Sequence, residues 1–287
     1  MADPTLERVV APDGATIAVH VLGDGAPLIC VPGGPARASE YLEDFAGLSE
    51  HRRLLRVDLR GTGMSPLPDA RDSLAFHRLA DDLEVVREAQ GLETVDLVSH
   101  SAGGFVVLAY AAKYPERVAS MVLVTPSARP FGDVEGDIAA IRASRSGEPW
   151  YAEAAAIAEE LEFAPSHRKM RFDPGMRVFG YAKWDERAQA HADSTDRQMS
   201  MRAMAAFAPS PDVAAELNMI ERLKTLEAPV LIVVGSLDGI TGVKSGHLVA
   251  EMLGNARVVE LPDAAHYPWI DSPEAFRSTV VSFLEGS

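Results

Sequence analysis

Cysteine is nearly absent from this chain of 287 residues, which contains a single one, Cys30. An internal disulfide is therefore excluded, and so is a metal site built from several cysteines. Because Cys30 lies in the apolar run Leu28–Val31, we expect a buried thiol with a packing role. The histidines and carboxylates show no metal-binding spacing either, so the sequence predicts neither a metal nor another cofactor.

Long apolar runs and an excess of basic residues are also missing. No stretch reaches membrane-spanning length, and the first residues lack the basic start and apolar run of a signal peptide. We therefore expect a cytoplasmic protein that makes no membrane contact. Lysine and arginine number 27 against 42 aspartates and glutamates, which gives a formal net charge of −15. This balance argues against nucleic acids and anionic membranes as partners.

Short apolar runs and helical periodicity alternate along most of the chain. The runs lie between turn signals, at residues 6–10, 16–21, 28–31, 54–58, 95–98, 121–124, 230–234 and 257–261. Helical periodicity is found at residues 73–90, 104–113, 244–253 and 273–284. Continuous β-branched runs that alternate with helices are typical of a parallel sheet covered on both faces. The pattern predicts a doubly wound, mostly parallel, eight-stranded α/β sheet that begins with a hairpin.

One region breaks this alternation, because no strand pattern is evident between residues 127 and 222. Alanine-rich and charged stretches with helical character occupy residues 151–163 and 185–207. Since the sheet pattern resumes afterwards, we interpret this region as a helical lid inserted after the sixth strand. The core then comprises residues 1–126 and 223–287. Four aromatic residues of the insertion are candidates for substrate contact: Trp150, Tyr151, Phe179 and Trp184.

The most informative segment reads Leu-Val-Ser-His-Ser-Ala-Gly-Gly, at residues 97–104. An apolar strand runs into a turn of small residues with Ser101 at its apex, and a helix pattern follows from Phe105. A turn this sharp exposes the hydroxyl above the sheet, and the positive end of the helix favours developing negative charge there. On this motif alone, a simple helix N-cap is an equally good interpretation of Ser101.

Residues suited to catalysis also follow other predicted strands. Pro32-Gly33-Gly34-Pro35 follows the third strand, Asp238 the seventh and His266 the eighth. The carboxyl ends of parallel strands face the ligand crevice of such a sheet. The order Ser101, Asp238, His266 resembles the nucleophile–acid–histidine order of the α/β-hydrolase superfamily. The resemblance covers essentially the whole chain.

This resemblance implies a serine hydrolase with a catalytic triad. His266 would accept the proton of Ser101 as a general base and return it later as an acid. Asp238 would fix the imidazole tautomer and stabilise the imidazolium. The backbone N–H groups of Ala102 and Gly34 would form the oxyanion hole, in which one donor is worth about 3 kcal/mol of transition-state stabilisation.

Several neighbouring residues compete for these roles. Asp263 precedes His266, but its loop is too local to reach around the imidazole, so Asp238 is the better acid. His100 adjoins the nucleophile, and we expect it to point away and to pack. Asp58 and Arg60 are catalytic residue types, yet a role in bracing the loop beside the oxyanion site fits them better.

The loops also suggest a branch of the superfamily. Residues 32–35 and the segment Asp58-Leu59-Arg60-Gly61-Thr62-Gly63-Met64-Ser65 resemble the proline iminopeptidase branch. That branch has histidine where this chain has Pro32 and glycine where it has Ala36. The resemblance implies a short peptide with N-terminal proline as the substrate. The apolar side chains of the helical insertion make a small ester, lactone or amide an equally good candidate. A cofactor-free perhydrolase and a non-catalytic ligand receptor are alternatives on the same fold, and the chain is expected to be a monomer or a homodimer.

Overall fold

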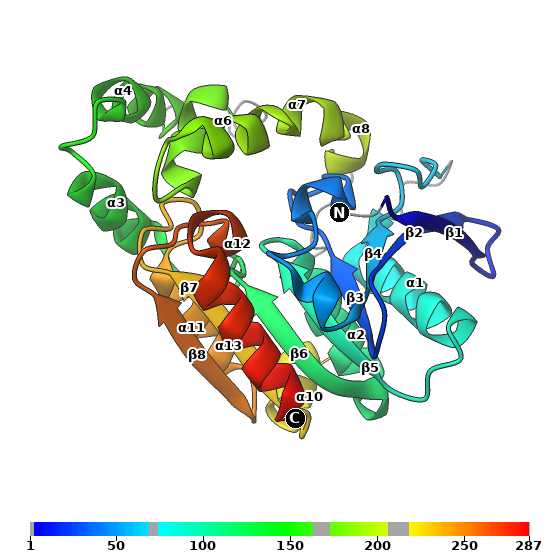
Figure 1. Ribbon diagram of the computed structural model, residues 1–287. Coiled ribbons are helices and arrows are strands. Elements are labelled where there is room, and N and C mark those ends of the chain that lie inside the picture. Colours follow the sequence, from blue (N-terminus) through cyan, green and yellow to red (C-terminus); the bar gives the residue numbers. More distant parts are fainter. Residues whose placement is uncertain (1–2, 69–73, 163–172, 206–217, 287) are drawn as a thin grey trace.

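An eight-stranded sheet forms the centre of the computed structural model, which describes residues 3–68, 74–162, 173–205 and 218–286 (Figure 1). The strand order is β1-β2-β4-β3-β5-β6-β7-β8. The strands are β1 Thr5–Val10, β2 Thr16–Leu22, β3 Pro27–Val31, β4 Arg53–Asp58, β5 Val95–His100, β6 Val118–Val124, β7 Val230–Gly235 and β8 Ala256–Leu261. β2 pairs antiparallel with β1 and β4, and every other pairing is parallel. The predicted doubly wound, mostly parallel sheet is confirmed.

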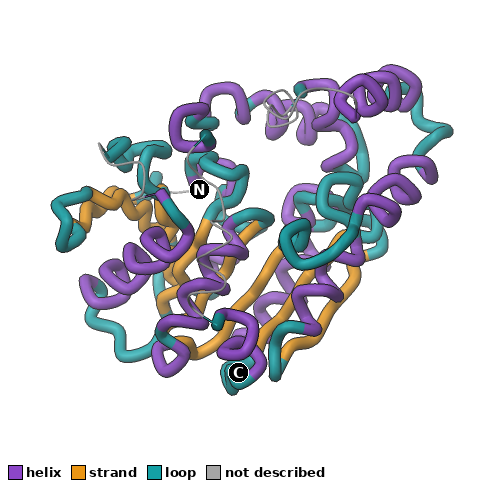
Figure 2. Tube along the Cα trace, turned by 180° about the vertical axis from the view of Figure 1, so that it is seen from behind, coloured by secondary structure: helices purple, strands orange, loops and turns teal. Residues whose placement is uncertain are grey.

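Helices cover both faces of the sheet (Figure 2). One face packs against α1 Phe76–Ala89, α2 Gly103–Lys113, α10 Met219–Lys224 and α11 Val243–Glu251. The other face packs against the 3₁₀ turns η1 Ser39–Leu42 and η2 Leu48–Glu50, and against α12 Pro268–Asp271 and α13 Pro273–Glu285. The four helices predicted from periodicity are therefore present.

The side chains of the central strands alternate between these two layers. In β7, Ile232 and Val234 pack on the α2 side, while Leu231 and Val233 pack on the α13 side. All four are almost completely buried, and each such side chain contributes about 1.5–3 kcal/mol of burial free energy. A strand that is apolar on both faces reads as a continuous hydrophobic run, which is why the sequence revealed it. Cys30 of β3 is likewise buried, and burial raises the pKa of its thiol to about 12.

Between β6 and β7 the described chain is helical, and Figure 1 shows this insertion as a layer above the carboxyl ends of the strands. It comprises α3 Glu135–Ser144, α4 Tyr151–Glu162, the 3₁₀ helix η5 Pro174–Gly180, α6 Glu186–Asp193, α7 Thr195–Gln198 and α8 Met201–Met204. α10 contributes Met219 and Leu223 to the main core, so the predicted boundary at residue 222 falls within a core helix. No helix of the described ranges is long and apolar enough to cross a membrane.

The prediction of one helical stretch over residues 185–207 was wrong in detail. Three short helices replace it, and residues 206 and 207 lie outside the described ranges. The break between α7 and α8 falls at Met199, which is extended and forms an isolated β-bridge with Arg37. Ser200 then caps α8 by accepting the N–H of Ala203. Pairing with the loop after β3 therefore interrupts the helical pattern.

Candidate active site

Ser101 occupies the turn between β5 and α2, where its φ of 52° lies in the left-handed region. For a residue other than glycine this conformation costs roughly 1–3 kcal/mol and is typical of functional sites. The turn is held closely by its neighbours. A Cβ at Gly33 would lie 2.5 Å from the carbonyl oxygen of His100, and one at Gly103 would lie 2.5 Å from that of Pro32. The small residues around the serine are therefore required by backbone packing.

His266 follows β8, and its ring is fixed by a buried acid. Its Nδ1 lies 3.0 Å from Oδ2 of Asp238, so Nε2 is the ring nitrogen left to serve a reacting group. The backbone of His266 is held equally firmly. Its N–H donates to the carbonyl of Gly180 at 3.0 Å, and its carbonyl accepts the Thr125 hydroxyl at 2.9 Å. The insertion and the residue that follows β6 thus both position the histidine.

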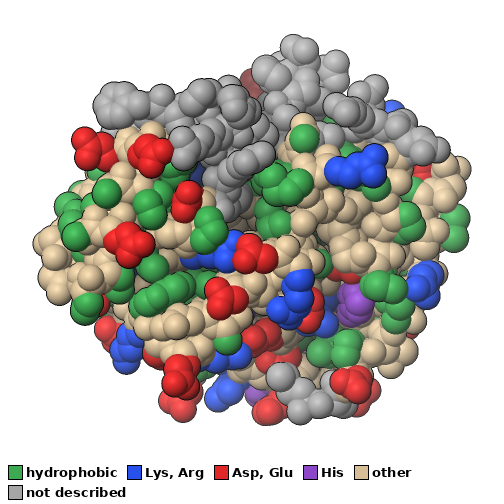
Figure 3. Space-filling model, turned by 90° about the horizontal axis from the view of Figure 1, so that it is seen from above, with side chains coloured by type: hydrophobic (Ala, Val, Ile, Leu, Met, Phe, Trp, Pro, Cys, Tyr) green, Lys and Arg blue, Asp and Glu red, His purple; other side chains and the backbone are tan. Residues whose placement is uncertain are grey.

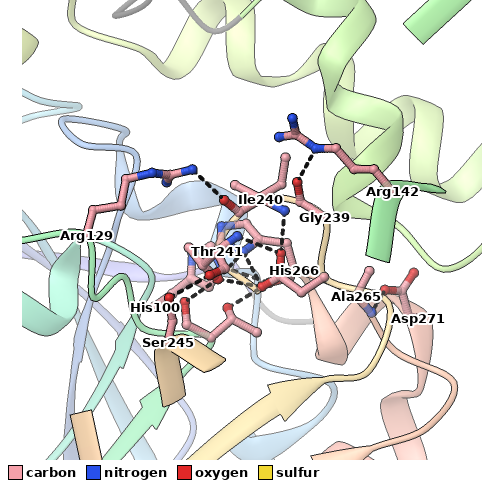
Figure 4. Close-up of polar contacts among 12 residues, drawn as sticks. His100, Arg129, Arg142, Gly239, Ile240, Thr241, Ser245, Ala265, His266 and Asp271 are labelled. Atoms are coloured by element: carbon pink, nitrogen blue, oxygen red, sulfur yellow. Dashed lines mark hydrogen bonds and ion pairs between the residues drawn. The ribbon is translucent and has the colours of Figure 1, made fainter. Parts of the chain in front are cut away.

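Asp238 follows β7 and is completely buried. Its Oδ1 accepts the N–H groups of Ile240 at 2.8 Å and Thr241 at 3.0 Å, and its Oδ2 also accepts the Thr241 hydroxyl at 2.5 Å. Figure 4 shows Thr241 beside His266. Burial acts to raise the pKa of this carboxyl, but His266 and the Thr241 hydrogen bonds outweigh it and hold the pKa below its usual value. Asp263, the rival acid, is exposed at the surface.

His100 packs beneath the site in a chain of hydrogen bonds. Its Nε2 lies 3.0 Å from the carbonyl oxygen of His266 and must donate, which leaves Nδ1 as an acceptor. The Tyr41 hydroxyl, 2.7 Å away, donates to that nitrogen and itself accepts the Gly33 N–H at 2.7 Å. Burial lowers the pKa of His100 well below its usual value, so the ring is neutral. The expectation of a packing role fits this placement.

A cavity of about 460 Å³ joins these elements, a size typical of small-molecule sites. Ser101, His266, Gly34 and Ala102 all line it. Among the described residues, no hydrogen bond uses the backbone N–H of Gly34 or Ala102. Both amides are therefore available to a ligand. The wall is otherwise mainly apolar and includes Pro35, Tyr41, Phe76, Phe105, Pro130, Met176, Tyr181, Met199, Ile240 and Tyr267.

The four aromatic residues predicted to touch substrate lie elsewhere. None of them is among the residues that line this cavity: Trp150, Tyr151, Phe179 and Trp184. Instead, Trp150 packs edge-on against Phe179 with ring centroids 5.2 Å apart, inside a small core between α4 and η5. This correction has a physical reason. α4 and η5 are separated from the main core, so they need a small apolar core of their own. These rings form part of it and hold the helices of the insertion together.

Asp58 and Arg60, at the end of β4 and just after it, hold neighbouring segments in place. Asp58 accepts the N–H groups of Ser39 and Met64, each at 2.8 Å. Arg60 donates to Asp82 at 2.6 and 2.7 Å. Neither Asp58 nor Arg60 lines the cavity. The two residues therefore fix the loops around the site without entering it.

Sequence reasoning missed three residues of the site. Thr241 follows Asp238 by three positions, and that spacing is a recognisable turn signal in which the carboxylate accepts nearby N–H groups. Tyr41 and Arg37 carried no such signal, because their importance depends on contacts with distant segments.

Comparison with known proteins identifies the family of this chain. A family model described as alpha/beta hydrolase fold matches residues 26–273. The chain belongs to this family. RutD of Caulobacter sp. (strain K31), named as a candidate carbamate hydrolase, is 28% identical over 258 residues, which are 86% of this chain and 85% of that protein.

Solved structures resemble this hydrolase over nearly its full length. The esterase RhEst1 from Rhodococcus sp. ECU1013 has a TM-score of 0.67 at 25% identity and covers 98% of each chain. Est816, described as an N-acyl homoserine lactone degrading enzyme, has a TM-score of 0.67 at 21% identity over 96% of this chain and 100% of its own. At that identity, the likeness to Est816 concerns the fold.

Proposed function

We propose that this hydrolase cleaves small carboxylic esters or lactones through an acyl-enzyme on Ser101. One observation carries the proposal. Ser101 stands on a left-handed turn in the wall of the same cavity as His266, and the ring of His266 is bound to buried Asp238. A nucleophile, a base and a group that orients the base are the arrangement that acyl transfer needs.

The reaction proceeds in two halves. Ser101 Oγ attacks the carbonyl carbon while His266 Nε2 accepts its proton, and the alcohol then leaves with that proton. Water attacks the acyl-enzyme in the second half, and His266 transfers a proton from the water to Ser101 as the acid is released. Asp238 stabilises the imidazolium of each step. Because its pKa is held low, it remains ionised throughout.

The backbone amides of Gly34 and Ala102 bind the oxyanion. Their lack of another hydrogen-bond partner in the described chain supports this role. Preorganised donors of this kind need no rearrangement as charge develops. Tyr41 indirectly contributes to the geometry, since it binds the N–H of Gly33, next to Gly34.

Esters and lactones suit the cavity better than peptides with a free N-terminal amine. An aminopeptidase needs carboxylates to hold the substrate's ammonium group. Among the described residues of the wall, Asp173 is the one carboxylate, whereas Arg37, Arg129 and Arg177 are cationic. The relatives named as a carbamate hydrolase and as an esterase support the same choice. The insertion supplies Met176, Tyr181 and Met199 to the wall, so it acts as a lid that shapes the substrate-binding cavity.

A hydrolysis screen tests the proposal. Short-chain aryl esters, simple lactones and a proline arylamide are compared at neutral pH with the wild type, Ser101→Ala and Ser278→Ala. Ser278 lies on the exposed side of α13, so its variant controls for the substitution itself. We expect ester or lactone turnover that Ser101→Ala abolishes and Ser278→Ala preserves, with a fluorophosphonate adduct on Ser101 detected by mass spectrometry. Turnover that persists in Ser101→Ala would refute the mechanism.

A further inference from the structure

Arg37 is a buried cation in the cavity wall, and its side-chain donors meet neutral groups. Only 2% of its surface is exposed. Its N–H groups donate to Gln198 Oε1 at 2.9 Å, Ser194 Oγ at 3.0 Å, the carbonyl of His191 at 3.2 Å and the Tyr267 hydroxyl at 3.4 Å. Among the described residues, no carboxylate contacts its guanidinium. A desolvated charge without a counter-ion is costly, so the site favours an anion.

The side chains around Arg37 do not supply that anion. Its guanidinium lies 4.1 Å from the ring centroid of Tyr41, a neutral partner whose pKa burial raises well above its usual value. Burial, and then the charge of Arg37, lower the pKa of His191 to about 3. The carboxylate of Glu40 accepts from Gln198 Nε2 at 3.1 Å, so the hydrogen bonds connect it to Arg37 through that amide.

A second arginine lies at the same end of α6. Arg177 donates to the carbonyl of Ala192, and Arg37 donates to the carbonyl of the preceding residue, His191. Arg177 also pairs with Asp196 at 2.5 Å, but that carboxylate is largely exposed. The Nε of Arg177 is buried and has no hydrogen-bond partner among the described residues. Two guanidinium groups with unused donor capacity therefore border one part of the cavity.

The cavity contrasts with the rest of the molecule. The chain has a net charge of −15, yet the described wall has three arginines and one aspartate. Figure 3 shows that the face above the carboxyl ends of the strands carries basic as well as acidic side chains around a hollow. Arg129 is half exposed and pairs with Glu135, so its charge is compensated near solvent, unlike that of Arg37. The cationic wall is thus not a consequence of overall composition.

We propose that the substrate carries a free carboxylate besides its ester or lactone group, and that Arg37 and Arg177 bind this carboxylate. The planar guanidinium groups match a carboxylate in shape and charge. This inference rests on the proposed function for the bond that is cleaved, and it adds the substrate class. A neutral ester of the same size would leave the buried cation unpaired in the complex.

Two matched pairs of esters test the inference on the wild-type enzyme. Phenyl hydrogen glutarate is compared with phenyl pentanoate, which places the charge on the acyl side. 4-Carboxyphenyl acetate is compared with 4-carbamoylphenyl acetate, which places it on the alcohol side. We expect kcat/KM to favour the anionic ester by about tenfold or more in at least one pair, as for a hydrogen bond to a charged group. Equal rates or a preference for the neutral ester in both pairs would overturn it.

A variant tests whether Arg37 causes the preference for the anionic ester. In Arg37→Gln the ratio of kcat/KM between anionic and neutral ester should fall to about one. Arg78→Gln removes an exposed arginine of α1 outside the cavity, and it should keep the wild-type ratio. Loss of the ratio in both variants would show a general charge effect and overturn the assignment to Arg37.

A binding measurement separates this inference from the proposed reaction and does not require Arg37→Gln to fold. Calorimetry on Ser101→Ala compares glutarate with its neutral diamide. Tighter binding of glutarate by about tenfold or more supports the carboxylate site even if no ester is hydrolysed, a result that would refute the proposed reaction alone. Ester turnover with no preference for either anion in rate or binding would refute the carboxylate site alone.

Discussion

Tyr41→Phe is a sharp test of how the active-site loops are held together. The substitution keeps the ring, which packs beside Trp269 and Arg37, and removes only the hydroxyl. That hydroxyl accepts the N–H of Gly33 and donates to Nδ1 of His100, both at 2.7 Å. No other hydrogen bond of either group is found in the described chain.

The expected loss of stability follows from these two contacts. Each buried group left without a partner costs about 1–3 kcal/mol, so the variant should lose about 2–6 kcal/mol. This is a large share of the 5–15 kcal/mol that is usual for the free energy of unfolding. Activity should fall as well, because Gly33 precedes the proposed oxyanion donor Gly34, and because His100 holds the carbonyl of His266.

Urea denaturation measures the change in the free energy of unfolding, and kcat/KM for an aryl ester measures the change in activity. Tyr114→Phe is the matched control, since its hydroxyl binds Asp81, a partly exposed carboxylate that Lys113 also contacts. The control should lose less than Tyr41→Phe, about 1 kcal/mol, because water can replace the hydroxyl at this partly exposed carboxylate. A Tyr41→Phe protein as stable as this control would refute the hydrogen-bond chain derived for His100.

Three further predictions concern the site and its surroundings. Asp238→Asn should lower kcat by about 10⁴ at neutral pH, because the buried histidine loses its orienting anion; steady-state kinetics checks this. Gly33→Ala should abolish activity, since its Cβ would lie 2.5 Å from the His100 carbonyl oxygen; kinetics and circular dichroism separate this effect from unfolding. Burial raises the pKa of Asp271 to about 7, so the folded state binds the proton more tightly and this group's stabilising contribution falls as pH rises from about 4 to 7. In that window the free energy of unfolding of wild type minus that of Asp271→Asn should therefore decrease in urea titrations; a constant difference would contradict the shift.

Local sequence patterns determined most of the architecture. Eight apolar runs became eight strands, and a central strand such as β7 is apolar along its length because helices cover both of its faces. The parallel connections then bring the carboxyl ends of the strands to one edge. Ser101, Asp238 and His266 each follow such a strand, so their approach to one another could be predicted from their order alone.

The sequence could not separate the residues that line the cavity from those that pack inside the insertion. Trp150 and Phe179 fit the pattern of a substrate wall, yet they form a core, while Met176 and Tyr181 face the cavity. Apolar residues at helical spacing look the same in both settings. Only the packing of the insertion on the sheet decides which side of each helix meets the active site.

Tertiary structure alone also created the cationic wall. Arg37 is one arginine among many in the sequence, and its desolvation comes from partners such as His191, which lies 154 residues away. A charged side chain can bind a ligand of opposite charge when it is buried away from water and has no counter-ion in the protein. Both conditions depend on segments that are distant in the sequence and adjacent in the folded structure. Local pattern therefore determined the sheet and the order of its proposed catalytic residues, whereas long-range packing decided the shape and charge of the cavity.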